Sequence, residues 1–391
     1  MNDTIRRLLT HARLRAAPSY ELVLFDRLSD GEQTAFGELK RDADFYGLMR
    51  PREGTVGTIK AVGCDTALLL HTLASASRLP HFALRDDAAL EGVVTMLVAG
   101  MLELEHEGAF VSAEAACALL SSPAREAAHH PLTRLSHDAL RLVAADPALG
   151  SATIAGALYQ ANRQPSSPRW ARRLPDRASV LAYVGVAPGS TLRRAAGDAW
   201  EIDGQQQHSP AWIYFVRRGS SFPGDAAGRD TTYKLYVSPT ADALPAVFAA
   251  VLDAATRSQV RHLKLGSDLA GLLRPDKLVL YFADLASLTA VAASIEAQCA
   301  GASVQGVPFT APIDRDGLLS WGADPPASAQ LLAWQPRDSW RTWLAARLGG
   351  AIAECLGRDR EVNTAFALER VRRDGVDIER WVATAALWTA A

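Results

Sequence analysis

Short runs of alternating apolar and polar residues predict a sheet in the second half of the chain. Three runs have the two-residue period of strands with one buried face: "YKLYVSP" (233–239), "VRHLKLGS" (260–267) and "DKLVLYF" (276–282). Residues 240–258 and 286–301 instead place apolar side chains at helical spacing, and Thr240 or Asp242 is the expected N-cap of the first helix. Strands mixed with helices indicate an α+β or α/β arrangement, of which we predict α+β.

The first half of the chain has mostly the helical pattern. Residues 1–50 are amphipathic and predict helices, whereas residues 55–63 alternate like a strand. A helix is expected over 64–77, with Asp65 as its N-cap. Residues 85–112 predict a helix that runs into a hairpin, with its turn at Glu107-Gly108. A hairpin, then helices, then a hairpin wing is the outline of a winged-helix module.

The remaining segments divide the chain into three parts. Residues 113–160 and 338–391 predict helices, and the Pro-, Ser- and Asn-rich stretch 162–170 predicts a linker. Four shorter features lie in the second part: two strands around Asp203-Gly204 (198–219), a Gly-rich loop (220–230), an edge strand marked by Pro308 (303–310) and a turn-rich segment that could border a cleft (317–326). We therefore predict a helical, winged-helix-like domain (1–160), a mixed α+β domain (161–337) and a helical C-terminal segment (338–391).

Composition and charge exclude several classes of protein. The chain has 391 residues, of which 49% are hydrophobic and 21% charged, with a net charge of −2, so no overall basic field attracts nucleic acid. The four cysteines, Cys64, Cys117, Cys299 and Cys355, have no C-x-x-C spacing, which favours a reducing cytoplasm over a disulfide framework or a zinc site. The N-terminus lacks the apolar core of a signal peptide, and the apolar run 93–102 is too short to span a membrane.

Lysine is concentrated in the predicted sheet. The chain has five lysines against thirty-six arginines, and three of the five are Lys234, Lys264 and Lys277. Lys234 and Tyr236 share one face of a strand, as do His262 and Lys264, because side chains two residues apart point the same way. If the two strands are neighbours, these four side chains lie on one surface, with Leu235, Val237, Leu263 and Leu265 on the opposite, buried face.

Such a cationic face has two interpretations. It suits a phosphate-bearing substrate, with Arg274 in the turn before the third strand as a further cation. It also fits an ordinary solvated face of a half-exposed sheet. A lysine that is desolvated or close to other cations has a lowered pKa and can act as a base, which arginine cannot. β-Elimination of phosphate needs such a base beside a phosphate site.

The same stretches resemble a known family. "YKLYVSP", "HLKLGSD" and "RPDKLVLYF", with "LYQANR" and "GSSFPGD", resemble segments of the phosphothreonine lyases and of the HopA1-like effector family, whose relatives act in lanthipeptide biosynthesis. The resemblance covers about residues 155–325. It implies a cofactor-independent lyase that converts phosphoserine or phosphothreonine of a precursor peptide into dehydroalanine or dehydrobutyrine. A separate kinase would phosphorylate that peptide, and neither a metal nor another cofactor is expected.

The resemblance also implies roles for individual residues. Lys264 would be the base, Lys234 and Arg274 would bind phosphate, and Lys277 and Tyr281 would flank the phosphate site. Tyr236 stands where these lyases have a general-acid histidine. Tyr236 or His262 could therefore supply the acid, the elimination could proceed without it, or the site could have lost catalysis.

The sequence is also compatible with other functions. The alternative to a lyase is a non-catalytic protein that binds a phosphopeptide, or an interaction protein like the type III effectors. Residues 53–112 resemble small winged-helix modules that hold leader peptides, but winged helices are widespread and a structural role is favoured for them. His129, His130 and His137 lie close together in the sequence. A helix cap and surface positions explain them better than a metal site, which would need further ligands in the right geometry. No P-loop, G-x-S-x-G, kinase or H-E-x-x-H motif is present.

Overall fold

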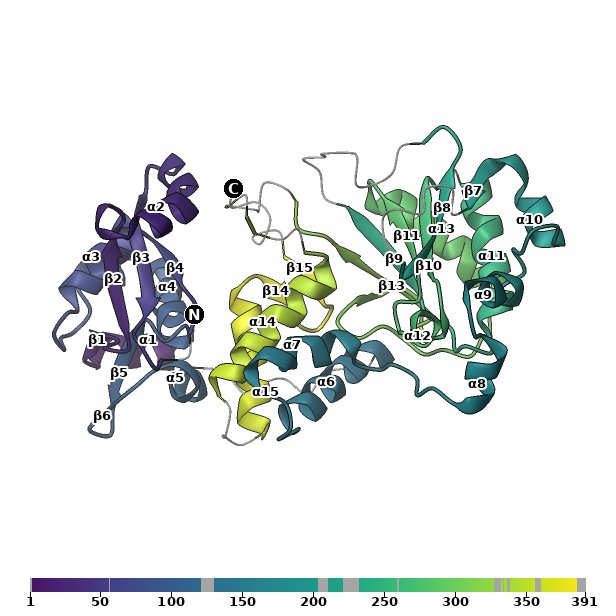
Figure 1. Ribbon diagram of the computed structural model, residues 1–391. Helices are drawn as coiled ribbons and strands as arrows, with labels where there is room; N and C mark the ends of the chain where they lie inside the picture. Colours follow the sequence, from purple (N-terminus) through teal and green to yellow (C-terminus); the bar gives the residue numbers. More distant parts are fainter. Residues whose placement is uncertain are drawn as a thin grey trace.

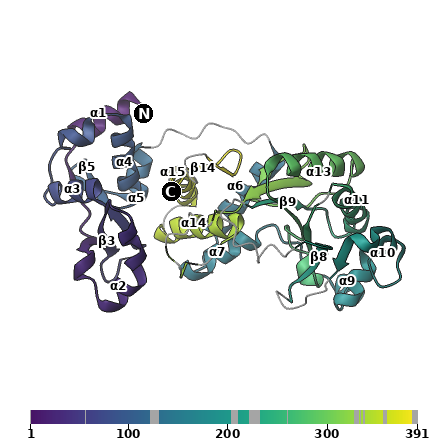
Figure 2. The same ribbon diagram turned by 90° about the horizontal axis from the view of Figure 1, so that it is seen from above.

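The computed structural model describes residues 2–55, 57–120, 130–202, 210–220, 232–258, 260–326, 332, 334–335, 338–355 and 360–384. Figure 1 shows three groups of elements: an N-terminal lobe with α1–α5, a middle group of helices, and a lobe built on a sheet. Figure 2 shows the same three groups from above, with α14 and α15 between the two outer lobes. The chain is therefore an α+β protein, as predicted. Within the described ranges, every helix is too short or too polar to cross a bilayer.

The described residues of the N-terminal lobe form two small antiparallel sheets and five α-helices. One sheet has the order β2-β3-β4 and the other β1-β5-β6. The elements are α1 (Asp3–His11), β1 (Leu14–Ala16), β2 (Tyr20–Leu24), α2 (Asp30–Phe36), β3 (Phe45–Pro51), β4 (Lys60–Gly63), α3 (Cys64–Thr72), α4 (Asp87–Val98), β5 (Leu102–His106), β6 (Ala109–Val111) and α5 (Ala113–Leu120), with 3₁₀ turns at Phe25–Arg27, Gly37–Arg41 and His81–Leu84.

Predictions for this lobe are confirmed in part. The hairpin turn lies at Glu107 and Gly108, whose φ angles of 49° and 80° match a two-residue turn with two left-handed positions. The prediction of helices throughout residues 1–50 is wrong, because β1, β2 and β3 interrupt them. Long-range pairing decides this: Gly47 of β3 lies so close to β2 that a Cβ there would be 2.4 Å from the Val23 carbonyl oxygen. Gly63, not Asp65, occupies the N-cap of α3.

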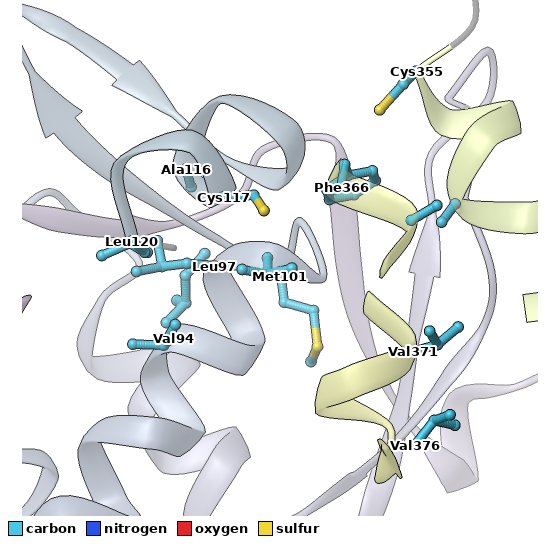
Figure 3. Close-up of a cluster of buried hydrophobic side chains, with 14 of the residues drawn as sticks. Val94, Leu97, Met101, Ala116, Cys117, Leu120, Cys355, Phe366, Val371 and Val376 are labelled. Carbon is cyan, nitrogen blue, oxygen red and sulfur yellow. The ribbon is translucent and has the colours of Figure 1, made fainter. Parts of the chain in front are cut away.

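The middle group is built from two parts of the chain, one that precedes the sheet lobe in sequence and one that follows it. It contains α6 (Pro131–Ala144), α7 (Ser151–Gln160), α14 (Trp340–Glu354) and α15 (Arg360–Arg373), with the short strands β14 (Val376–Asp377) and β15 (Val382–Ala383). One buried apolar cluster runs from the N-terminal lobe into these helices. Figure 3 shows part of it, with Leu97 and Met101 on one side and Phe366 and Val371 of α15 on the other. The C-terminal helices thus pack on the first apolar cluster, and the division at residues 160 and 337 stays a prediction.

The third lobe is an antiparallel sheet with the strand order β12-β13-β9-β11-β10-β8-β7. Its strands are β7 (Trp200–Ile202), β8 (Trp212–Arg217), β9 (Tyr233–Val237), β10 (His262–Gly266), β11 (Leu278–Phe282), β12 (Ala311–Pro312) and β13 (Leu319–Ala323). The helices are α8 (Pro168–Arg173), α9 (Arg177–Tyr183), α10 (Thr191–Ala196), α11 (Leu244–Arg257), α12 (Leu269–Leu272) and α13 (Leu285–Gln298), with a 3₁₀ turn at Gly197–Ala199. Helices α11 and α13 bury one face of the sheet in a second apolar cluster (Figure 1).

The structure corrects several expectations for this lobe. Residues 303–310 form no strand, and only an isolated bridge joins Val304 to Pro239. Residues 317–326 were expected to be rich in turns, yet they contain β13, which pairs with β9. Ala243 precedes α11 and its side chain makes no capping hydrogen bond, so neither Thr240 nor Asp242 is the N-cap.

Three predicted features lie wholly or largely outside the described residues. These are the turn at Asp203-Gly204, the Gly-rich loop, of which only residue 220 is described, and His129. The winged-helix assignment stays a prediction, because the order of strands and helices does not establish it.

Candidate functional site

The polar face of the large sheet carries the predicted site. Leu235, Val237, Leu263 and Leu265 are fully buried on the opposite face, as predicted from the alternation. The sequence placed β9 and β10 side by side, whereas β11 lies between them. In the antiparallel register, Tyr281 of β11 faces Lys234 on one side and His262 on the other. Lys264 of β10 faces Val279 in this register, but its amine and that of Lys234 both lie within 5.6 Å of the centre of the Tyr281 ring.

Lys264 lies among aromatic rings. Its amine is 4.1 Å from the centre of the Trp212 ring and 5.6 Å from that of Tyr281. Burial, followed by the charge of Lys234, lowers the pKa of Lys264 from 10.5 to about 7, against the opposing effect of Asp276. A large fraction of Lys264 is therefore neutral near neutral pH, which is the state that a general base requires.

Lys234 is held by a carboxylate from the neighbouring strand. Its amine forms an ion pair with Asp324, which directly follows β13, and its side chain is only 11% exposed. The amine also lies 5.4 Å from the centre of the Tyr281 ring. The other oxygen of Asp324 accepts a hydrogen bond of 2.9 Å from the backbone N–H of Trp340, at the start of α14. Lys234 is therefore a fixed cation beside Lys264.

Arg274 belongs to a buried network at the edge of the same face. Its guanidinium donates to both oxygens of Asp276, at 2.8 and 2.9 Å, and to the Tyr159 hydroxyl at 2.8 Å. Arg341 of α14 forms a second ion pair with Asp276, at 2.8 Å. The two guanidinium groups hold the pKa of Asp276 well below its ordinary value, despite its burial. The middle helices thus contribute Tyr159 and Arg341 to a network that fixes Arg274.

Positive charge exceeds negative charge in this part of the face. Lys234, Lys264, Arg274 and Arg341 face two carboxylates, Asp276 and Asp324. The surplus is two charges when Lys264 is protonated and one when it is neutral. An anion such as a phosphate group is favoured in both states, because the surrounding protein groups are largely withdrawn from water.

Lys277 does not join this group. Its side chain is fully buried, and its amine donates to the Pro239 carbonyl at 2.7 Å and to the side-chain oxygen of Gln305. Burial lowers the pKa of Lys277 to about 7. Because the side chain is completely buried, its amine is out of reach of a substrate, and we leave Lys277 out of the candidate site.

The two residues considered as the general acid are both nearly buried. Tyr236 is 3% exposed and packs against Val279 and Val307, while His262 is 9% exposed. Burial raises the pKa of Tyr236 well above 10, so its hydroxyl keeps its proton. Tyr281 lies between the two site lysines, and burial raises its pKa in the same direction. All three belong to the polar face, and Tyr281 adds a hydroxyl to the candidates for the acid.

Several site residues were not found by reading the sequence. Asp276 stood in the quoted stretch "RPDKLVLYF", two residues after Arg274, but it was not recognised as the partner of that arginine. Trp212 could have been found from the alternation of its strand. Tyr159, Asp324 and Arg341 come from distant parts of the chain and carry no local signal. No cluster of three or more potential metal ligands occurs among the described residues.

Comparison with known proteins gives distant structural similarities only. No family model matches the chain, and no curated protein matches it. An effector protein from Pseudomonas syringae pv. tomato strain DC3000 aligns with 66% of this chain and 98% of its own, at 10% identity and a TM-score of 0.40. An effector protein from Pseudomonas syringae pv. syringae strain 61 aligns with 65% and 98%, at 11% identity and a TM-score of 0.36.

A third similarity is to the type III effector and phosphothreonine lyase OspF from Shigella flexneri. It covers 38% of this chain and 78% of that protein, at 12% identity and a TM-score of 0.26. At these TM-scores and identities the similarities do not assign an activity to this chain.

Proposed function

We propose that this protein is a cofactor-independent lyase that removes phosphate by β-elimination from phosphoserine or phosphothreonine in a peptide. The observation that carries the proposal is Lys264, a lysine whose pKa is lowered to about 7 beside the fixed cation Lys234. A base must lose its proton near working pH, and the departing phosphate must meet positive charge. The polar face combines both requirements within a few side chains.

In the proposed reaction, the neutral amine of Lys264 takes the proton from Cα of the phosphorylated residue. The electron pair of that C–H bond forms the Cα–Cβ double bond, and the Cβ–O bond breaks with its electron pair going to the phosphate. Lys234 and Arg274 stabilise the negative charge that develops on the leaving group. The products are dehydroalanine or dehydrobutyrine, free phosphate and a protonated Lys264, which returns its proton to solvent.

Tyr236, His262 and Tyr281 are the candidates for a proton donor to the leaving oxygen. Replacing each in turn separates them: only loss of the true donor lowers turnover of a phosphopeptide while leaving a substrate with a better leaving group unaffected. The peptide would be the precursor of a lanthipeptide-type product, and a separate kinase would phosphorylate it. These two assignments rest on the resemblance described above.

A non-catalytic phosphopeptide-binding protein is the alternative. It is favoured by Tyr236, which occupies the position of the acid histidine in the resembling lyases and lies almost wholly inside the protein. Such a protein would use the same cations for binding and would have no turnover. Like a type III effector, it would act through its interaction with a partner.

The deciding experiment is mass spectrometry of phosphoserine and phosphothreonine peptides after incubation with the protein, without metal or nucleotide. We expect a mass loss equal to one phosphoric acid, and Lys264→Ala should slow it by about 10²–10⁴-fold. Lys264→Arg should be nearly as slow, since a guanidinium does not give up its proton. Lys40→Ala is the matched control, because Lys40 is largely exposed and its ion pair with Asp26 lies on the surface.

A leader sequence could be required, so the precursor peptide phosphorylated by its own kinase is tested in parallel. If that peptide also stays intact but binds the protein through Lys234, the binding-protein alternative replaces the lyase.

A further inference from the structure

A second site lies away from the polar face, where the N-terminal lobe meets helices α14 and α15. A cavity of about 530 Å³ opens there. Thr58 and Lys60, before and at the start of β4, line one side together with Val98 and Met101 around the end of α4. Figure 3 shows Met101 extending from the N-terminal lobe toward α15. The volume lies within the range of pockets that hold small organic ligands, about 300–1,000 Å³.

The opposite side of the cavity is open along α14. Ala346 and Gly350 lie one helical turn apart and line it, followed by Glu354. A Cβ placed on Gly350 would have no heavy atom within 4 Å. The space in front of this helix therefore exists because residue 350 is a glycine; a larger side chain at this position would fill it.

The carboxylates that line the cavity already have partners. Glu354 pairs with Arg370 at 3.1 Å, and Asp374 pairs with Arg347 at 3.4 Å. Each of these pairs has one cation and one anion. They leave no net charge for a ligand to satisfy.

Arg373 is balanced by acids outside the cavity lining. It pairs with Glu91 at 3.0 Å and with Glu369 at 2.7 Å. The remaining charged residue of the lining is Lys60, which is one of the five lysines of the chain.

Lys60 has only neutral partners among the described residues. Its amine donates to the Tyr20 hydroxyl at 2.9 Å and to the Thr58 carbonyl at 3.2 Å, and it lies 4.5 Å from the centre of the Tyr20 ring. No carboxylate in the described part of the chain is within ion-pair distance of it. Glu354 and Asp374 act on Lys60 from a distance and raise its pKa, but burial outweighs them and both carboxylates are paired with arginines. A bound anion within ion-pair distance would offset the remaining cost of burying this ammonium group.

We propose that this cavity binds a small organic carboxylate with a short apolar tail. The carboxylate pairs with the ammonium group of Lys60, and the tail lies against Val98, Met101 and the open stretch of α14 around Gly350. The single unbalanced charge selects a monoanion, and the apolar walls select a ligand with a hydrocarbon part. This site is independent of the proposed lyase reaction, because it shares no residue with the polar face.

Octanoate, octanol and octylamine are suitable probes, because they share a tail and differ in charge. In isothermal titration calorimetry, we expect octanoate to bind saturably at one site and the other two to bind at least about tenfold more weakly. Lys60→Met should lower octanoate affinity by about tenfold or more. Burial, together with the charge of Arg370, lowers the pKa of Lys60 to about 8 against the raising effects of Glu354 and Asp374. Octanoate binding should therefore weaken as pH rises above that value, and it should not do so in Lys60→Met.

Gly350→Leu tests the same cavity without touching a charge. It fills the open space from a helical position, so we expect a folded protein that no longer binds octanoate. Gly92→Leu is the matched control, since Gly92 is an exposed helical glycine of α4 outside the cavity with equally open surroundings. Octanoate that binds Gly350→Leu as tightly as the original protein, octylamine that binds as well as octanoate, or an absence of saturable octanoate binding would each overturn the proposal.

Discussion

Single residues on the polar face derive their chemistry from neighbours on other strands. Lys264 and Lys277 both have a pKa of about 7, and burial is the main cause for each. Their surroundings nevertheless differ, because Lys264 faces aromatic rings and Lys277 donates to protein oxygens. A lowered pKa alone thus does not identify a base; the lysine must also lie where a substrate can reach its amine.

The pH dependence of turnover tests the pairing of the two site lysines. Turnover should rise with pH through about 7, as Lys264 loses its proton. In Lys234→Met this rise should move to higher pH, since the variant removes a cation that lowers the pKa of Lys264 and leaves Asp324 unneutralised. The measurement is kcat/KM for a phosphopeptide across the pH range.

A double variant provides the control for that shift. Lys234→Met with Asp324→Asn removes the cation and the carboxylate together, so the midpoint should lie between those of the original protein and the single variant. An unchanged midpoint in Lys234→Met would show that a group other than Lys264 controls the rate.

At the scale of elements, the start of α14 fixes the geometry of β13. Trp340 is fully buried, and a Cβ on Gly322 would lie 2.7 Å from its indole ring. In the register of the sheet, Gly322 is the neighbour of Lys234. The absence of a side chain at position 322 therefore lets α14 approach the strand next to the site.

Gly322→Val should disturb both stability and the site. The added side chain must displace Trp340, and overpacking of this kind costs about 1–3 kcal/mol of unfolding free energy. The backbone N–H of Trp340 donates to Asp324, which in turn pairs with Lys234. A displaced Trp340 should therefore also weaken phosphopeptide binding through Lys234. Urea denaturation and a binding titration measure the two effects. Gly31→Val, at a helical glycine with open surroundings, is the control, and equal losses in both variants would contradict this account.

At the scale of the whole molecule, the middle helices connect the two outer lobes. Arg341 of α14 is 2% exposed, pairs with Asp276 at 2.8 Å and donates to the Tyr159 carbonyl at 2.8 Å. Farther along α14, one face of the helix, which includes Ala346, Gly350 and Glu354, lines the cavity against the N-terminal lobe. One helix thus contributes to the network beside the polar face and to the wall of the second site.

Arg341→Leu should destabilise the protein and weaken the site. Removing one partner of a buried ion pair costs about 3–5 kcal/mol of unfolding free energy. Arg257→Leu removes an exposed i,i+4 pair with Asp253 and should cost about 1 kcal/mol or less. Urea denaturation compares the two variants. A similar small loss in both would mean that the Asp276 network does not hold the helices on the sheet.

The sequence predicted the elements of the site better than their arrangement. Strands over 233–237, 262–266 and 278–282 and their buried leucines follow from a two-residue alternation, which is a local signal. The order β9-β11-β10 does not, because strand neighbours are chosen by pairing across the whole lobe. Strand β13 also depends on pairing with a distant segment, β9, and its own sequence predicted turns.

What the sequence determined by itself is which side chains share a face: Lys234 with Tyr236, and His262 with Lys264. The period of a strand fixes this regardless of its neighbours. Only the tertiary structure decided that Tyr281 lies between the two lysines, that Lys277 turns inward, and that Asp276 receives Arg341 from a helix sixty-five residues further along the chain. Ion pairs and burial depend on residues that meet only after folding, and they set the pKa values on which the chemistry depends.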